Sequence, residues 1–76
     1  MTLKDLRIGQ SARVAGFVKG NDKSYRKKLL SMGLTPDTLF SVTRVAPMGD
    51  PIEIAVRGFS LSLRGDEAAS LLVEAA

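Results

Sequence analysis

The side chains of this chain that could do chemistry are mainly carboxylates and amines. Its 76 residues include no His and no Cys, so the side chains that most often hold iron, zinc or copper are absent. Carboxylates stand close together twice, as Asp50 with Glu53 and as Asp66 with Glu67. Such pairs at a turn and at a helix start more often stabilise the hairpin or the helix dipole than bind a cation. The sequence therefore predicts no metal site and no cofactor.

Catalysis is not expected either. Without His or Cys, the usual general bases and nucleophiles reduce to isolated carboxylates, lysines and serines. The segment from Gly16 to Gly20 has neither the glycine pattern nor the Lys-Ser or Lys-Thr ending of a phosphate-binding loop. We therefore interpret the chain as a binding protein and assign any nucleotide to a partner.

The most concentrated charge is the triplet of Arg26, Lys27 and Lys28. Residues 1–44 hold nine basic and three acidic residues, whereas residues 45–76 hold two basic and five acidic residues. The net charge of +3 thus originates in one region of the chain. Three successive cations cannot all point into a core, so they predict a basic surface ridge, which is either a solvated helix face or a binding surface.

A helix is expected to present this ridge. Tyr25, Leu29 and Met32 recur at helical spacing and would share one apolar face, which Leu30 widens. This face would point inward and leave the three cations outside. The helix is therefore predicted to be amphipathic, with the apolar face in the core.

Residues at both ends of this segment predict where the helix begins and ends. Asn21 or Asp22 can cap the N-terminus with a side-chain oxygen. Gly33 stands where a left-handed C-cap residue is needed, and Pro36 blocks any continuation. We expect the helix to end within a residue or two of Met32.

Strands are predicted for most of the remaining chain. Two apolar alternations, over 52–56 and 59–63, change phase at Arg57-Gly58, where a two-residue turn would place both sets of apolar residues on one face. That turn pairs Val56 with Phe59, Ile54 with Leu61 and Ile52 with Leu63. We also expect a short helical turn near residues 3–8, strands over 11–19 and 38–46, a connection at 47–51, a helical turn from 65 and a closing strand over 71–74.

This order of elements predicts a mainly β fold with one principal helix, as a small SH3-like, partly open β-barrel. Residues 1–76 are expected to form a single domain. No run approaches the roughly 18 apolar residues that span a membrane, and the first residues lack the apolar segment of a secretory signal. The sequence thus predicts a cytoplasmic protein.

The chain also resembles a known family. The segments RKKLLSMGLTP and VTRVAPMGDPIEIAVRGFSLSLR, followed by LLVE, are similar to the FeoA family of small bacterial proteins over residues 3–74. The resemblance implies an SH3-like barrel that works in the cytosol with FeoB, a membrane ferrous-iron transporter whose cytoplasmic part contains a GTP-binding domain. It also implies likeness to the C-terminal domain of DtxR-type repressors. Asp37 replaces the usual Gly after the Pro, but Asp tolerates left-handed conformations, so we expect the turn to survive.

Three functions remain from this reading. The first is an accessory protein that docks on the cytoplasmic domain of a FeoB-type transporter and so reaches the membrane only through its partner. The second is a basic nucleic-acid-binding barrel, in which Lys23 and Arg44 would extend the ridge. The third is a stand-alone regulatory domain of a metal-dependent repressor. The candidate partner-binding residues are Arg26, Lys27, Lys28, Met48 and Asp50.

The small number of aromatic residues separates the first two functions. Only Phe17, Tyr25, Phe40 and Phe59 are aromatic, and two of them are assigned inward, so no stacking platform for single strands is expected. We therefore expect no nucleic-acid partner. The effect on the transporter stays open among nucleotide turnover, oligomer stability and gating. A weak homo-oligomer is also open, because an exposed barrel edge can pair with a second copy or with a partner strand.

Overall fold

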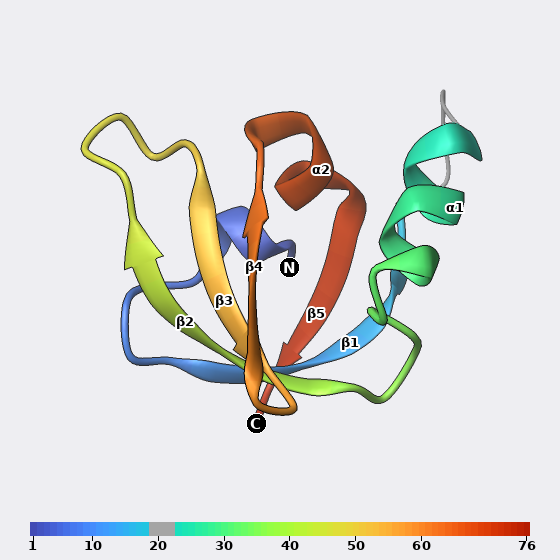
Figure 1. The fold of residues 1–76 in the computed structure, drawn as a ribbon, viewed down its shortest axis with the longest axis horizontal. Helices are drawn as coiled ribbons and strands as arrows, with labels where there is room; N and C mark the ends of the chain where they lie inside the picture. The colour runs from blue at the N-terminus through green and yellow to red at the C-terminus, as the bar shows by residue number, and fades with distance from the viewer. Residues whose placement is uncertain (19–22) are drawn as a thin grey trace.

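More residues lie in strands than in helices in the structure, a computed structural model that describes residues 1–18 and 23–76 of the chain. The predicted order of elements is confirmed, although the first helical turn is shorter and the last helix longer than expected. The elements are η1 (Leu3–Asp5), β1 (Ser11–Phe17), α1 (Lys23–Ser31), β2 (Leu39–Val45), β3 (Ile52–Val56), β4 (Phe59–Leu63), α2 (Gly65–Ser70) and β5 (Leu71–Ala75) (Figure 1). None of the described helices is long and apolar enough to cross a membrane.

The five strands form one antiparallel sheet in the order β4-β3-β2-β1-β5. Its two edge strands, β4 and β5, do not pair with each other, so the sheet curves without closing (Figure 1). Register shifts occur in β1 between Val14 and Gly16 and in β2 between Val42 and Arg44. Such bulges bend a strand and increase its twist. The predicted mainly β, partly open fold is confirmed.

The β3–β4 hairpin has the predicted register, with the Val56–Phe59 pair flanking the turn. Arg57 and Gly58 both have positive φ, 47° and 87°, as a two-residue type I′ turn requires. This register places the apolar residues of both strands on one face, as predicted, but the rest of the fold does not cover that face evenly. Phe59 is 44% exposed and Leu61 half-buried, because β4 is an edge strand that its neighbours only partly cover.

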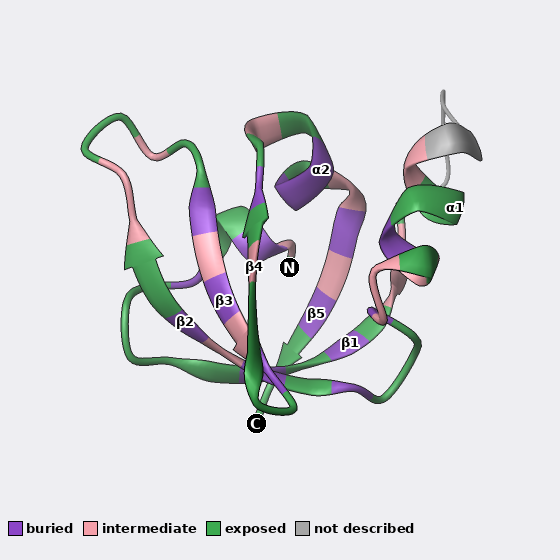
Figure 2. Cartoon of the chain, in the orientation of Figure 1, coloured by how far each residue is buried: buried purple, intermediate pink, exposed green. Residues whose placement is uncertain are grey.

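The core lies on the concave side of the sheet, where buried residues from strands and helices meet (Figure 2). The apolar face predicted for α1 contributes Leu29, which is fully buried, and Met32, which packs at the margin. The fully buried side chains include Leu3, Val14, Leu29, Leu34, Ile54, Leu63 and Leu71. A core drawn from so many elements fixes α1 against the sheet through its apolar face.

The C-terminus of α1 follows the predicted stop signal. Gly33 has a φ of 94°, and the amide of Leu34 donates to the carbonyl of Leu29 at 3.1 Å. This bond back across the last turn is characteristic of a Schellman cap, and Leu34 is buried beneath it. The end of α1 at Ser31 is therefore confirmed. The predicted cap at Asn21 or Asp22 lies outside the described residues.

The turn after α1 tolerates its acidic residue as expected. Asp37 has a φ of 70°, and its amide donates to the carbonyl of Val14 at 2.8 Å. The hydroxyls of Thr35 and Thr38 are hydrogen-bonded at 2.9 Å, and Thr38 is buried before β2 begins. These contacts fix the direction in which the chain leaves α1 for β2.

Candidate partner-binding surface

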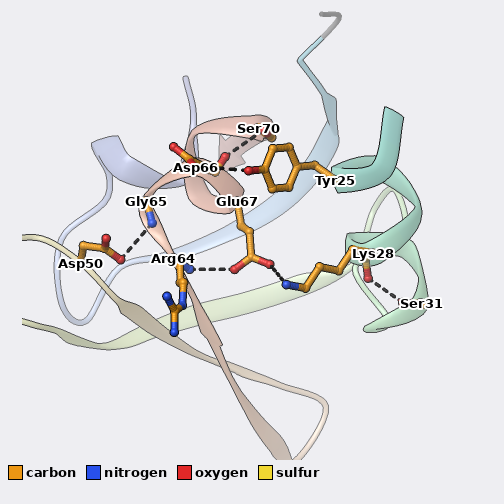
Figure 3. Close-up of polar contacts among 9 residues, drawn as sticks. All are labelled: Tyr25, Lys28, Ser31, Asp50, Arg64, Gly65, Asp66, Glu67 and Ser70. Carbon is orange, nitrogen blue, oxygen red and sulfur yellow. Dashed lines mark hydrogen bonds and ion pairs between the residues drawn. The ribbon is translucent and has the colours of Figure 1, made fainter. Parts of the chain in front are cut away.

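An ion pair attaches α1 to α2. The Lys28 ammonium lies 2.6 Å from Oε2 of Glu67, and Oε1 of Glu67 accepts a hydrogen bond from the Arg64 amide at 2.9 Å (Figure 3). Glu67 is 4% exposed, whereas the Lys28 side chain is 60% exposed. Lys28 is therefore both part of the surface ridge and the counter-ion of a buried carboxylate.

The electrostatics of Glu67 follow from these two bonds. Hydrogen bonding by Lys28 is the main cause that lowers the pKa of Glu67, the Arg64 amide lowers it further, and burial opposes both. Among the described residues, Lys28 is the only partner of Oε2, which is otherwise a buried oxygen without a hydrogen bond. The carboxylate thus depends on an ammonium group from another helix.

A second contact joins the same two helices. The hydroxyl of Tyr25, a half-buried residue of α1, donates to Oδ2 of Asp66 at 3.4 Å (Figure 3). Asp66 is the neighbour of Glu67 in α2, so consecutive acidic residues contact α1 at two points one helical turn apart. These contacts orient α1 and therefore determine where its cations point.

Asp50 links the loop between β2 and β3 to α2. Its Oδ1 accepts a hydrogen bond from the amide of Gly65 at 2.9 Å, at the first residue of α2 (Figure 3). A carboxylate at this position satisfies a free helix amide and complements the helix dipole. A Cβ added at Gly65 would lie 3.4 Å from Oδ2 of Asp50 and 3.8 Å from the ammonium of Lys4, which are ordinary van der Waals contacts. Asp50, a predicted partner-binding residue, has a structural role.

Arg26, Lys27 and Met48 are the remaining predicted residues. Arg26 and Lys27 are exposed on α1, and neither forms an ion pair with a described residue. Met48 is 92% exposed in the 46–51 loop, where the Gly49 amide donates to the Ala46 carbonyl at 2.7 Å. The loop thus holds an apolar side chain outside the core on a hydrogen-bonded turn.

The loop, α2 and α1 follow one another along one side of the molecule (Figure 1). We call this side the α2 rim and define it by Met48, by Gly65–Ser70 and by Arg26 and Lys27. Its exposed charged groups are Arg26 and Lys27 of α1 and Asp66 of α2, and Met48 adds an exposed apolar side chain. Sequence reasoning missed the role of Glu67 beyond the helix dipole, because its partner Lys28 is far away in sequence.

The nucleic-acid alternative gains little from this geometry. Arg44 is exposed on β2 and therefore belongs to the sheet, while Lys23 begins α1. Phe40 is buried, Phe17 and Tyr25 are half-buried, and Phe59 is partly exposed. These four residues are all the aromatic residues of the chain. Phe59 is thus the one exposed aromatic residue, whereas proteins that bind single strands stack successive bases on several aromatic side chains.

No group of three or more His, Cys, Asp or Glu side chains within residues 1–18 and 23–76 is arranged to hold a metal ion. The acidic residues singled out in the sequence lie in separate contacts. Asp50 faces Gly65, Asp66 faces Tyr25, and Glu67 faces Lys28. Each of these three carboxylates thus contacts a different group within the described part of the fold.

Comparison with known proteins gives a family and two close relatives. A family model described as the FeoA domain matches residues 1–75. A Porphyromonas gingivalis protein, named as a fusion of Fe(2+) transport protein A and Fe(2+) transporter FeoB, is 32% identical over 74 residues. That match covers 97% of this chain and only 8% of the fusion protein. The structure of a FeoA-like protein from Clostridium acetobutylicum is 39% identical, with a TM-score of 0.88 over 99% of this chain and 85% of that chain.

Two more distant structures show the likeness of the fold alone. FeoA of Stenotrophomonas maltophilia, described as a procaryotic SH3 domain protein, is 24% identical, with a TM-score of 0.82 over 97% of this chain and 89% of that chain. A manganese-dependent transcriptional repressor is 20% identical, with a TM-score of 0.89 over 99% of this chain and 36% of that chain. The predicted SH3-like class and the likeness to a repressor domain are confirmed.

Proposed function

Because the chain belongs to the FeoA family, we propose that it is a non-catalytic accessory protein of ferrous-iron uptake that docks on the cytoplasmic part of a FeoB-type transporter. One observation carries this proposal: nearly the whole of this chain matches a segment of the Porphyromonas gingivalis protein that is named as a fusion with FeoB. Covalent linkage holds two partners at an effective concentration in the millimolar range. A separate chain needs a surface that achieves the association without a linker, and it would meet the transporter in the cytoplasm.

The α2 rim is the docking surface that we propose. Arg26 and Lys27 are exposed and without ion-pair partners among the described residues, so they can pair with acidic groups without breaking an internal contact. Met48 supplies an exposed apolar side chain in the 46–51 loop, which contacts α2 through Asp50. Lys28 and Asp50 contribute indirectly, because their contacts with Glu67 and Gly65 orient α1 and the loop.

The test is calorimetry with the soluble cytoplasmic domain of the FeoB-type transporter from the same organism, without nucleotide and with GDP or a GTP analogue. The rim variant combines Arg26→Glu with Lys27→Glu and leaves Lys28 in place. We expect it to bind about tenfold more weakly than the parent at low salt. At high salt, the difference in affinity between variant and parent should be smaller. Met48→Ser tests the apolar contact separately.

Arg7→Glu paired with Arg13→Glu is the matched control. It makes the same change of net charge at two exposed residues outside α1. Circular dichroism of each variant confirms that it is folded. Parental affinity in a folded rim variant would place docking elsewhere, and absence of binding by the parent in every nucleotide state would refute the proposed function. Salt-dependent binding to random oligonucleotides would instead favour the nucleic-acid function.

A further inference from the structure

A second surface lies at the free edge of β4. The sheet ends at β4 on one side and at β5 on the other. The β5 edge is partly occupied by the N-terminal residues, since the Val73 amide donates to the Met1 carbonyl at 3.0 Å and Thr2 forms a bridge with Leu72. Beside β4, no described segment adds a strand or bridge on the side away from β3.

The register of the hairpin identifies the free backbone groups of β4. In a hairpin with a two-residue turn, the residues that flank the turn, here Val56 and Phe59, exchange hydrogen bonds. Backbone groups alternate in direction along a strand, so the amides and carbonyls of Ser60 and Ser62 point away from β3. No hydrogen bond to them from a described residue occurs outside the ladder. They are available to an added strand.

The side chains of β4 do not block an added strand. Edge strands usually carry charges or proline that prevent pairing with other chains. The sequence of β4 is Phe-Ser-Leu-Ser-Leu, which contains neither. On the concave face, Phe59 is 44% exposed and Leu61 is half-buried, so a neighbouring strand would also cover apolar surface.

We propose that the β4 edge binds an extended segment of a partner protein by strand addition, and that this segment has acidic residues at both ends. Arg57 precedes β4 and Arg64 follows it, and both are exposed. The Arg64 side chain points away from Glu67, so it is not occupied by that carboxylate (Figure 3). Arg57 lies in the turn before β4 and Arg64 follows its last residue, so the two cations flank a strand of 5 residues, roughly 16 Å long. Acidic residues at both ends of an added strand would complement them.

The same charges disfavour a second copy of this chain as the occupant. If two β4 strands pair antiparallel about Leu61, Arg57 of one copy comes beside Arg64 of the other at each end. In parallel pairing, each Arg faces its own equivalent. Like charges on neighbouring strands are destabilising. The edge is therefore suited to a different, acidic chain, and this inference is independent of docking at the α2 rim.

The first experiment uses a capped peptide of alternating Thr and Val with two Glu residues at each end, titrated into the isotope-labelled full chain. We expect the amide signals of Ser60 and Ser62 to shift and their hydrogen exchange to slow about tenfold at saturation. A peptide with Lys in place of Glu should bind at least about tenfold more weakly. Equal binding of the two peptides would overturn the role of charge, and shifts confined to other segments would overturn the site.

Matched variants test the backbone contact. Ser62→Pro removes an amide that points away from β3, which an edge strand tolerates, and it should weaken peptide binding about tenfold. Ser62→Ala keeps the amide and should bind like the parent. If Ser62→Pro does not fold, an N-methylated version of the acidic peptide removes the same kind of bond from the ligand side. Undiminished binding of the folded proline variant or of the methylated peptide would refute strand addition. A concentration-dependent dimer of the parent that Ser62→Pro abolishes would show a second copy as the occupant.

Discussion

Replacing Lys28 by Met should destabilise the fold, although Lys28 lies on an exposed ridge. The substitution keeps a long apolar side chain and removes the ammonium that lies 2.6 Å from Oε2 of Glu67. Among the described residues, that oxygen then has no partner. The neighbouring change Lys27→Met removes an exposed cation without an ion pair and serves as the control.

The expected cost follows from the burial of the two groups. A buried acceptor that loses its partner costs about 1 to 3 kcal/mol, and more if it is charged. Removing one partner of a fully buried ion pair costs about 3 to 5 kcal/mol. Lys28 is 60% exposed, so solvent screens the pair and water can approach the freed carboxylate of Glu67. We therefore expect a loss of about 1 to 3 kcal/mol, which lowers Tm by roughly 4 to 8 °C for each kcal/mol in a domain of this size. Lys27→Met should change stability by less than about 0.5 kcal/mol.

The loss should depend on pH in a defined direction. In the parent, the pKa of Glu67 lies below its usual value of 4.5, so its pairing stabilises the fold above that pH and is lost as the pH falls through the folded pKa. In Lys28→Met the main cause of that lowering is gone, while burial still raises the pKa. The charged carboxylate then costs stability at neutral pH and ceases to do so once protonated. The difference between parent and variant should therefore shrink in acid.

Urea unfolding followed by circular dichroism, at about pH 7 and about pH 3, measures this difference. Lys28→Met is also measured in the variant Glu67→Gln, where the side chain at position 67 carries no charge and is stabilised less by the Lys28 ammonium. Lys28→Met should cost less there than in the parent, as a double-mutant cycle would show. The reasoning fails if Lys28→Met matches Lys27→Met at neutral pH, or if its cost is the same in acid.

Further substitutions and a titration test other parts of the structure. Gly33→Val should cost about 1 to 3 kcal/mol, because φ is 94° there, while Gly16→Ala, where an added Cβ meets nothing within 4 Å, should change the thermal midpoint little. Asp50→Ala should cost about 1 kcal/mol in urea melts by freeing the Gly65 amide, and Asp50→Asn should retain most of that stability. Leu29→Ala should lower stability by about 2 to 5 kcal/mol, because Leu29 is fully buried. Anaerobic titration with ferrous iron should show no binding tighter than about millimolar, and a stoichiometric micromolar site would contradict this.

Local patterns in the sequence predicted much of the fold. The turn at Arg57-Gly58 and the pairing of Val56 with Phe59 followed from a change of apolar phase, because a period of two leaves one register that puts both sets on one face. The stop at Gly33 followed from backbone conformation, which few other residues adopt. Both signals are contained within a few residues.

The contacts that position the candidate site join residues far apart in the chain, and no local pattern encodes them. Lys28 and Glu67 are 39 positions apart, and Asp50 and Gly65 are 15 apart. From the sequence, Lys28 was equivalent to Lys27, and Asp50 was equally available to a partner. Only the packing of α2 against α1 and the loop distinguishes cations that stabilise the fold from those that remain for binding. The exposure of Phe59 was missed for a related reason. The alternation of apolar and polar residues predicts which face of a strand a side chain is on, but not which other elements cover that face.

The short helix α2 has only six residues, but it contacts both neighbouring parts of the rim. Its consecutive residues Gly65, Asp66 and Glu67 contact the 46–51 loop through Asp50 and α1 through Tyr25 and Lys28. Met48, Arg26 and Lys27 are exposed, and none of the three forms an ion pair with a described residue. α2 lies between the 46–51 loop and α1 and contacts both, so it helps to determine their relative position (Figure 1). A substitution that loosens α2 should weaken docking at the rim even though it removes none of the groups that contact the partner, whereas binding at the β4 edge, which depends on the β3–β4 ladder, should persist.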